Sequence, residues 1–99
     1  MPRRKAFLDQ FDPETLAMLL DSGSSDITEW TERLIDAWQS GNADDQSRAR
    51  HSLKGLCENF GAHTLLVHCE RDLSDPAAAA TLREYRELTL RMLREVAQG

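Results

Sequence analysis

Apolar residues recur every three or four positions along most of the chain, which is the spacing of one buried face of an α-helix. The clearest example lies within residues 43–60, where the apolar set is Ala49, Leu53, Leu56, Cys57 and Phe60. β-branched residues are scarce in the rest of the chain. The pattern predicts an all-α fold, an antiparallel four-helix bundle with a short additional N-terminal helix.

Capping residues and turn residues mark where these helices begin and end. Asp12 and Pro13 are typical of a helix start, and the short first helix is expected to end at Ser22-Gly23. Gly61 is expected to adopt the left-handed conformation that ends a helix. The other four helices are expected from Ser24 or Ser25 to Ser40, from about Ala43 to Phe60, from about Ala62 to Leu73, and from about Pro76 to Ala97.

The expected inward faces follow from the same spacing. In the second helix they are Ile27, Trp30, Thr31, Leu34 and Trp38, and in the last helix Leu82, Tyr85, Leu88 or Thr89, Met92 and Val96. The two tryptophans are interpreted as core aromatics, although one at the margin of the stripe could help form a docking surface. The chain should form one domain over residues 1–99, with residues 1–11 packing on the end of the bundle.

Composition and charge exclude several classes of function. A net charge of −5 argues against a nucleic-acid partner, which would require a basic face. The longest apolar run is far too short to span a bilayer, and the N-terminus lacks the apolar core of a signal peptide. We therefore expect a cytoplasmic protein without a membrane partner. Cys57 and Cys69 fall at apolar helix positions and are expected to be reduced core residues.

His51 lies on the side of its helix opposite the apolar stripe. At about 100° per residue, the stripe centres near Leu53 and Phe60, so His51 points about 180° away, towards solvent. Arg48 and Lys54 lie three residues to either side of His51, within reach on a helix surface. Gly55 lies one turn further along, also on the outward side.

Two features of this surface suggest that the histidine carries phosphate. A glycine inside a helix costs about 1 kcal/mol relative to alanine, and Gly55 faces away from the predicted core. Neighbouring cations favour a neutral, nucleophilic His51 and would stabilise a dianionic phosphoryl group on its ring. These are the properties of a phosphoacceptor that a partner protein must approach closely.

The segment His51-Ser52-Leu53-Lys54-Gly55, followed by Asn59-Phe60-Gly61-Ala62 and by Leu65 and Cys69, resembles the histidine-containing phosphotransfer (HPt) domains of two-component phosphorelays. The resemblance implies a four-helix bundle that relays a phosphoryl group between receiver-domain aspartates. It implies that His51 is the phosphoacceptor, that Lys54 stabilises the phosphate, and that Gly55 provides steric access. Where the family often has Glu or Gln near the other ring nitrogen, this chain has Leu73, with Asp72 beside it.

The same resemblance implies the partners. These are response-regulator receiver domains or a hybrid histidine kinase, with any Mg²⁺ held by the receiver and no cofactor on this chain, which should be monomeric. The chain would be a phosphoryl carrier rather than an enzyme, without autokinase activity, since it has no glycine-rich phosphate loop. The surface around His51 that would contact a partner consists of Ser47, Arg48, Ser52, Glu58 and Asn59.

Two other interpretations remain open from the residues alone. A helical bundle could dock on a receiver or kinase and scaffold or inhibit it without carrying phosphate. A metal site could be proposed from His63, His68, Cys57 and Cys69, but the two histidines are five residues apart, which does not match the i, i+4 spacing of a helical metal pair. No metal ligand is therefore assigned.

Overall fold

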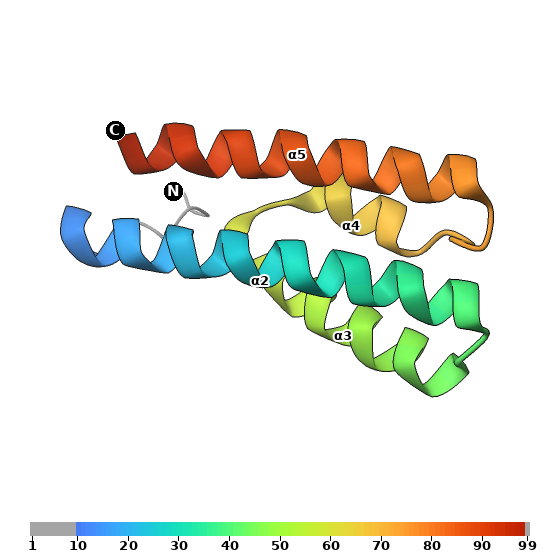
Figure 1. Ribbon diagram of the computed structural model, residues 1–99. Coiled ribbons are helices and arrows are strands. Elements are labelled where there is room, and N and C mark those ends of the chain that lie inside the picture. Colours follow the sequence, from blue (N-terminus) through green and yellow to red (C-terminus); the bar gives the residue numbers. More distant parts are fainter. Residues whose placement is uncertain (1–9, 99) are drawn as a thin grey trace.

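The computed structural model describes residues 10–98, which form four helices and no strand: α2 (Pro13–Ser40), α3 (Ala43–Phe60), α4 (His63–Cys69) and α5 (Pro76–Gln98). Successive helices run in opposite directions, and α2 lies between α3 and α5 (Figure 1). The predicted all-α class and antiparallel four-helix bundle are confirmed. The expected packing of residues 1–11 on the bundle end concerns a segment of which residues 1–9 lie outside the described residues.

The predicted break at Ser22-Gly23 is wrong, because α2 runs without interruption from Pro13 to Ser40. The side chain of Asp12 caps this helix as expected, accepting a hydrogen bond of 2.8 Å from the backbone N–H of Thr15. The inward spacing continues through the supposed break, since Leu20, Gly23 and Ile27 are all buried. No separate N-terminal helix therefore covers residues 13–22, and the bundle is built on one long helix.

Gly23 is buried where α2 approaches the end of α3. A Cβ atom at this position would lie 2.5 Å from Cζ and 2.6 Å from Cε2 of Phe60. Those distances are far inside van der Waals contact, so only a residue without a side chain allows the phenyl ring to lie against the α2 backbone. The glycine is thus part of the inward stripe, and the sequence signal of a helix end was in fact the signal of a close helix–helix contact.

The end of α3 has the expected left-handed glycine, and the turn between α2 and α3 contains another. Gly41 and Gly61 have positive φ values of 72° and 70°, the left-handed conformation that glycine adopts without strain. The side chain of Asn42 caps α3 by accepting a hydrogen bond from the backbone N–H of Asp45. These caps fix both ends of α3 and therefore the position of His51 along the bundle.

The fourth helix is shorter than predicted, because α4 ends at Cys69 rather than at Leu73. Leu73 is nevertheless fully buried, in the connection to α5. The side chain of Asp72 accepts two hydrogen bonds from Ser74, one from its backbone N–H and one from its hydroxyl, which hold this connection in a turn. An apolar residue in a loop can complete a core as well as one in a helix, and periodicity alone cannot distinguish the two.

The inward face of α5 also differs from the predicted one. Leu82, Thr89 and Leu93 are buried, whereas Met92 and Val96 are 45% and 43% exposed. The stripe that faces α2 is therefore rotated relative to the expected one. Part of the contact between α5 and α2 is polar, because Arg83 and Arg86 both donate hydrogen bonds to Glu32 on α2.

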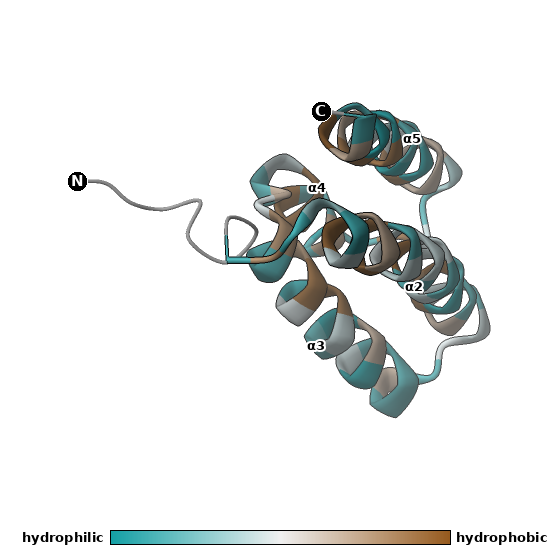
Figure 2. Ribbon diagram, turned by 90° about the vertical axis from the view of Figure 1, so that its left-hand side faces the viewer, coloured by the Kyte–Doolittle hydropathy of each residue, from teal (hydrophilic) through white to brown (hydrophobic). Residues whose placement is uncertain are grey.

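The core lies between all four helices, and the apolar residues are concentrated on their facing sides (Figure 2). It consists of Leu20, Ile27, Leu34, Ile35, Ala49, Leu53, Cys57, Ala62, Leu65, Cys69, Leu73, Ala78, Ala79, Leu82 and Leu93. Trp30 and Trp38 are half-buried and pack against this cluster from α2. The buried stripe of α3, formed by Ala49, Leu53 and Cys57, turns the opposite face of that helix outward.

Candidate functional site

His51 lies in the middle of α3 on its solvent face. Its side chain is exposed, while Leu53, two residues further along, is completely buried. Within residues 10–98, no other residue forms a hydrogen bond with the His51 ring. The predicted position of the histidine is therefore confirmed, and its ring nitrogens can be reached by a molecule outside the bundle.

Gly55 is exposed on the same face, one helical turn beyond His51. A Cβ atom added to it would have no heavy atom within 4 Å, apart from the neighbouring backbone of its own helix. No helix in the described part of the chain packs on this glycine. The bundle therefore supplies no packing reason for accepting the helix-propensity cost of about 1 kcal/mol.

Two of the predicted cations on this surface differ in their environment. Arg48 is exposed and its guanidinium lies 3.4 Å from the carboxylate of Asp45, so part of its charge is balanced within α3. Lys54 is exposed and, within residues 10–98, makes no ion pair. Lys54 therefore carries an unbalanced positive charge one helical turn from His51.

The other residues predicted to contact a partner occupy the same outward side of α3. Ser47, Glu58 and Asn59 are exposed, and Ser52 is half-buried. With His51 and Gly55 they form a continuous surface along the helix, because residues three and four apart in sequence are neighbours on a helix surface. We refer to this surface, residues 47, 48, 51, 52, 54, 55, 58 and 59, as the His51 face.

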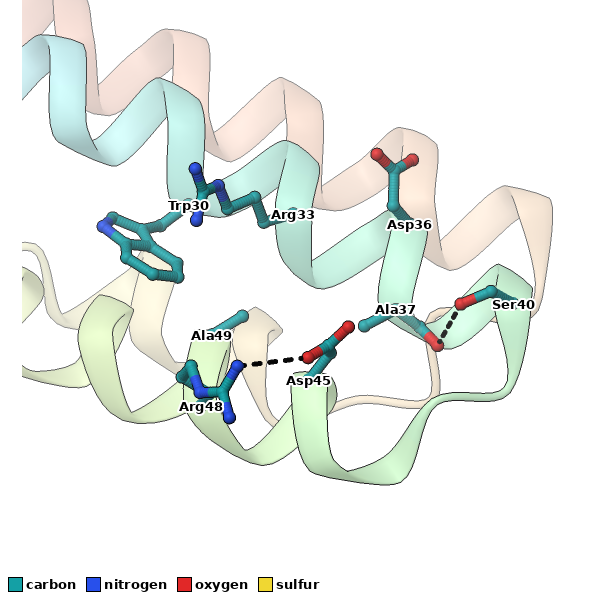
Figure 3. Close-up of a pocket in the computed structure, with 8 residues that line it drawn as sticks. All are labelled: Trp30, Arg33, Asp36, Ala37, Ser40, Asp45, Arg48 and Ala49. Atoms are coloured by element: carbon teal, nitrogen blue, oxygen red, sulfur yellow. Dashed lines mark hydrogen bonds and ion pairs between the residues drawn. The ribbon is translucent and has the colours of Figure 1, made fainter.

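A pocket of about 300 Å³ adjoins the His51 face between α2 and α3 (Figure 3). Arg48 contributes to both. The remaining lining residues are Trp30, Arg33, Asp36, Ala37, Ser40, Asp45 and Ala49. Two alanines, Ala37 on α2 and Ala49 on α3, leave the space open where larger side chains would fill it.

The walls of this pocket combine an aromatic surface with balanced charges. The guanidinium of Arg33 lies 4.8 Å from the centroid of the Trp30 ring, a cation–π contact, and pairs with Glu29 at 2.6 Å. Arg48 and Asp45 form the opposite wall. Sequence reasoning allowed one of the two tryptophans, without choosing between them, to lie at the margin of the inward stripe. It missed the pocket, because the two facing alanines come from different helices.

Among residues 10–98, no group forms a hydrogen bond that would orient the His51 ring. Leu73, which occupies the position expected for an orienting Glu or Gln, is fully buried. The neighbouring carboxylate of Asp72 is engaged by the hydroxyl and the backbone N–H of Ser74, which lower the pKa of Asp72. The carboxylate of Asp72 therefore stabilises the turn before α5.

The residues considered as metal ligands are not assembled into a site. Among residues 10–98, no cluster of three or more His, Cys, Asp or Glu side chains is placed to hold a metal ion. Cys57 and Cys69 are buried free thiols in contact with each other. The hydrogen bond between them raises the pKa of Cys69, and burial raises it further. His63 is exposed, whereas the ring of His68 stacks on Tyr85 with 4.2 Å between centroids.

Two further findings bear on what the chain is. In the part of the chain that the structure describes, none of the helices combines the length and the apolar character needed to cross a bilayer. A comparison with protein-family models, with curated proteins and with solved structures found no match to this chain.

Proposed function

We propose that this chain is a histidine phosphotransfer protein, which relays a phosphoryl group between receiver-domain aspartates through phospho-His51. The observation that supports this most strongly is the open surface around the histidine. His51 and Lys54 are exposed on one helix face, and the Cβ position of Gly55 has no neighbour within 4 Å. A nucleophile, a cation and space for a partner are the three requirements of phosphoryl transfer between proteins.

In the proposed reaction, a neutral ring nitrogen of His51 attacks the phosphorus of an aspartyl phosphate on the receiver. The P–O bond to the aspartate breaks as the N–P bond forms, and the carboxylate leaves with the bonding electron pair. The reverse reaction delivers the phosphoryl group to a second aspartate. The receiver contributes Mg²⁺, and this chain contributes the ammonium group of Lys54, which balances charge on the phosphoryl oxygens.

The surroundings of His51 suit a transient partner. The His51 face is polar, and the adjoining pocket offers an indole surface between paired charges, which could receive one side chain of the receiver. Electrostatic pairs at the rim of an interface direct association more than they hold the complex together. A carrier that must release one receiver before it meets the next needs such a weak interface. A cytoplasmic location follows from this role.

The proposal is tested by transfer from a phosphorylated receiver domain. The chain is incubated with a panel of purified receivers that carry a radiolabelled aspartyl phosphate, and label on the chain is followed over time. We expect label that is labile in acid and stable in base, as for a phosphoramidate. His51→Gln should abolish this label while leaving the helical circular dichroism unchanged, because an exposed side chain contributes little to stability.

The control separates carriage of phosphate from simple docking. His63→Gln changes another exposed histidine and should leave labelling unaffected. If the His51→Gln variant were labelled as strongly as the wild-type chain, the assignment would be wrong. If a receiver bound the chain but no phosphate appeared on any histidine, a docking module that scaffolds or inhibits the receiver would be the better interpretation.

A further inference from the structure

Three large apolar side chains are exposed on one side of α5. Leu88, Met92 and Val96 follow each other at intervals of four residues and are 46%, 45% and 43% exposed. They form a stripe along the last three turns of the helix, next to the buried face made by Thr89 and Leu93. We refer to these three residues as the α5 stripe. It lies on a different helix from His51, so the proposed phosphotransfer does not account for it.

A pocket of about 300 Å³ opens at one end of the α5 stripe. Four residues of α5 line it, Tyr85, Leu88, Thr89 and Met92, and the start of α4 closes its far side. These four have the i, i+3, i+4, i+7 spacing of the hole that accepts one side chain from a facing helix in knobs-into-holes packing. The pocket therefore has the shape of a receptor for a helix.

In place of the monomer that the family resemblance implies, we propose that a second copy of this chain occupies the α5 stripe, with the two α5 helices antiparallel and Met92 at the two-fold axis. Val96 lies four residues after Met92, and Leu88 lies four residues before it. Val96 of each copy then reaches the hole formed by Tyr85, Leu88, Thr89 and Met92 of the other. The contact is isologous, so the same surface serves both partners and the pair is closed.

The charges beside the stripe favour this orientation. Arg91 and Glu95 flank it on one side, and within residues 10–98 neither forms an ion pair. In the antiparallel pair, Arg91 of one copy lies beside Glu95 of the other, and this contact occurs twice. In a parallel pair the two-fold axis runs along the helices, so the side of one copy that carries Arg91 and Glu95 lies across from the opposite side of the other copy, and this pairing is lost. Both charges are thus unsatisfied in one chain and complementary between two chains.

The exposed side of α5 is long enough for a second helix to pack on it but too short for a strong dimer. α2 runs alongside α5, and the start of α4 lies beside the middle of α5, at Tyr85 to Met92 (Figure 1). The two copies would share only about three helical turns, so the area buried on each partner would be less than the roughly 800 Å² of a stable interface. The dimer should therefore be weak and depend on concentration. His51, on α3, remains exposed in both copies.

The experiment is sedimentation equilibrium of the full chain over about 10 µM to 1 mM, the concentration range in which weak association is populated. We expect the average mass to rise from that of a monomer towards that of a dimer. Met92→Glu should remove the rise by placing two carboxylates at the two-fold axis. Met18→Glu, which alters another exposed methionine on α2, is the matched control and should dimerise like the wild-type chain.

A charge exchange tests the orientation. Arg91→Glu alone and Glu95→Arg alone should each weaken dimerisation about tenfold, because each creates two like-charged contacts. The double variant should recover it. Circular dichroism would show that each variant is folded.

A chain that stays monomeric at every concentration would overturn the proposal and leave the stripe to residues 1–9 or to a different protein. Loss of dimerisation in Met18→Glu, or failure of the charge exchange to restore it, would also overturn it. Labelling of His51 by phosphoramidate should be the same in all these variants, so the outcome does not depend on the proposed function.

Discussion

The two glycines inside helices, Gly23 and Gly55, make the most informative comparison in this molecule. Gly23 is buried, and a Cβ atom there would lie 2.5 Å from the ring of Phe60. Gly55 is exposed, and a Cβ atom there would meet nothing within 4 Å. Both cost the helix about 1 kcal/mol relative to alanine. The first cost is explained by packing inside the bundle, and the second is not.

The charged residues repeat this contrast. On the α2–α5 side, the carboxylate of Glu32 accepts hydrogen bonds from Arg83 and Arg86, so opposite charges are balanced within the fold. On the His51 face, Lys54 makes no ion pair within residues 10–98. In the first region, opposite charges are paired within the chain. The other has an open position and an unbalanced cation around a nucleophile, which is the arrangement expected where a phosphorylated partner must approach.

The largest expected effect comes from filling the open position. Gly55→Arg should slow transfer from a phosphorylated receiver about 100-fold, because a long side chain beside His51 moves the receiver out of the near-attack geometry. Stopped-flow or quenched-flow measurement of label transfer would show the change. The variant should remain folded, because the position is exposed.

Phosphoramidate provides the control for this variant, since it is small enough to reach the ring without a protein interface. Its reaction with His51 should be slowed far less than transfer from the receiver. Equal slowing of both reactions would mean that the arginine acts on the chemistry of the ring. An unchanged rate of receiver transfer would contradict our account of this glycine.

The next largest effect is on stability, because alanine at Gly55 and alanine at Gly23 should change the free energy of unfolding in opposite directions. Gly55→Ala should raise the free energy of unfolding by about 1 kcal/mol, through helix propensity alone. Gly23→Ala should lower it by about 1 kcal/mol, since overpacking of about 2 kcal/mol exceeds the same propensity gain. Urea denaturation followed by circular dichroism measures both. Stabilisation by Gly23→Ala would show that the contact with Phe60 relaxes easily.

The double variant Gly23→Ala/Phe60→Leu sharpens this test, because it removes the aromatic atoms that the new methyl group would meet. The alanine should cost less in this background than in the wild-type chain. A double-mutant cycle gives the coupling between the two positions. No coupling would mean that the ring does not determine the choice of glycine.

A smaller effect is expected at the unbalanced cation. Lys54→Ala should slow transfer to His51, or shorten the lifetime of phospho-His51, by about tenfold, the loss of one charge-assisted contact of about 1.4 kcal/mol at an exposed site. Lys54→Arg should keep most of the effect, because it preserves the charge. Identical time courses for Lys54→Ala and the wild-type chain would remove the electrostatic role of this residue.

The smallest effect concerns the charge-balanced region. Hydrogen bonding from Arg83, and then from Arg86, lowers the pKa of Glu32 from 4.5 to about 2. Because the folded-state pKa is depressed, this contribution to stability is fully present above about pH 4.5 and is lost as pH falls through 2. The Glu32 side chain is 40% exposed, so solvent screening reduces the contribution to about 1 kcal/mol.

The test is the unfolding free energy of Glu32→Gln against pH. At pH 7 the variant should be about 1 kcal/mol less stable than the wild-type chain, and the two should converge near pH 2. A constant difference across this range would show that the loss comes from packing rather than from the carboxylate charge. Phosphotransfer at pH 7 should be unaffected, since Glu32 is not part of the His51 face.

Sequence pattern was sufficient for the parts of the fold that depend on local chemistry. The cap at Asp12, the left-handed Gly61 and the outward direction of His51 all follow from one helix or one turn. Gly55 was also placed correctly, because the direction of a residue on a helix depends only on its spacing from the buried stripe.

The two most consequential errors involve contacts between distant segments. Gly23 was interpreted as a helix end because its partner, Phe60, lies 37 positions away along the chain. The face of α5 was assigned through Met92 and Val96, whereas Leu93 is buried. Thr89, which the pattern allowed in place of Leu88, is also buried, and its hydroxyl donates to the carbonyl oxygen of Tyr85. The pocket beside the His51 face was missed for the same reason, as its two alanines belong to different helices.

The most direct test of the central claim is to locate the phosphate among the three histidines of the chain. The full chain would be phosphorylated by a receiver and analysed by tandem mass spectrometry at neutral to basic pH, where a phosphoramidate survives. We predict phosphate on His51 alone, with His63 and His68 unmodified. Phosphate on His63 or His68, or none on His51 in a chain that carries histidine-bound label, would contradict the account.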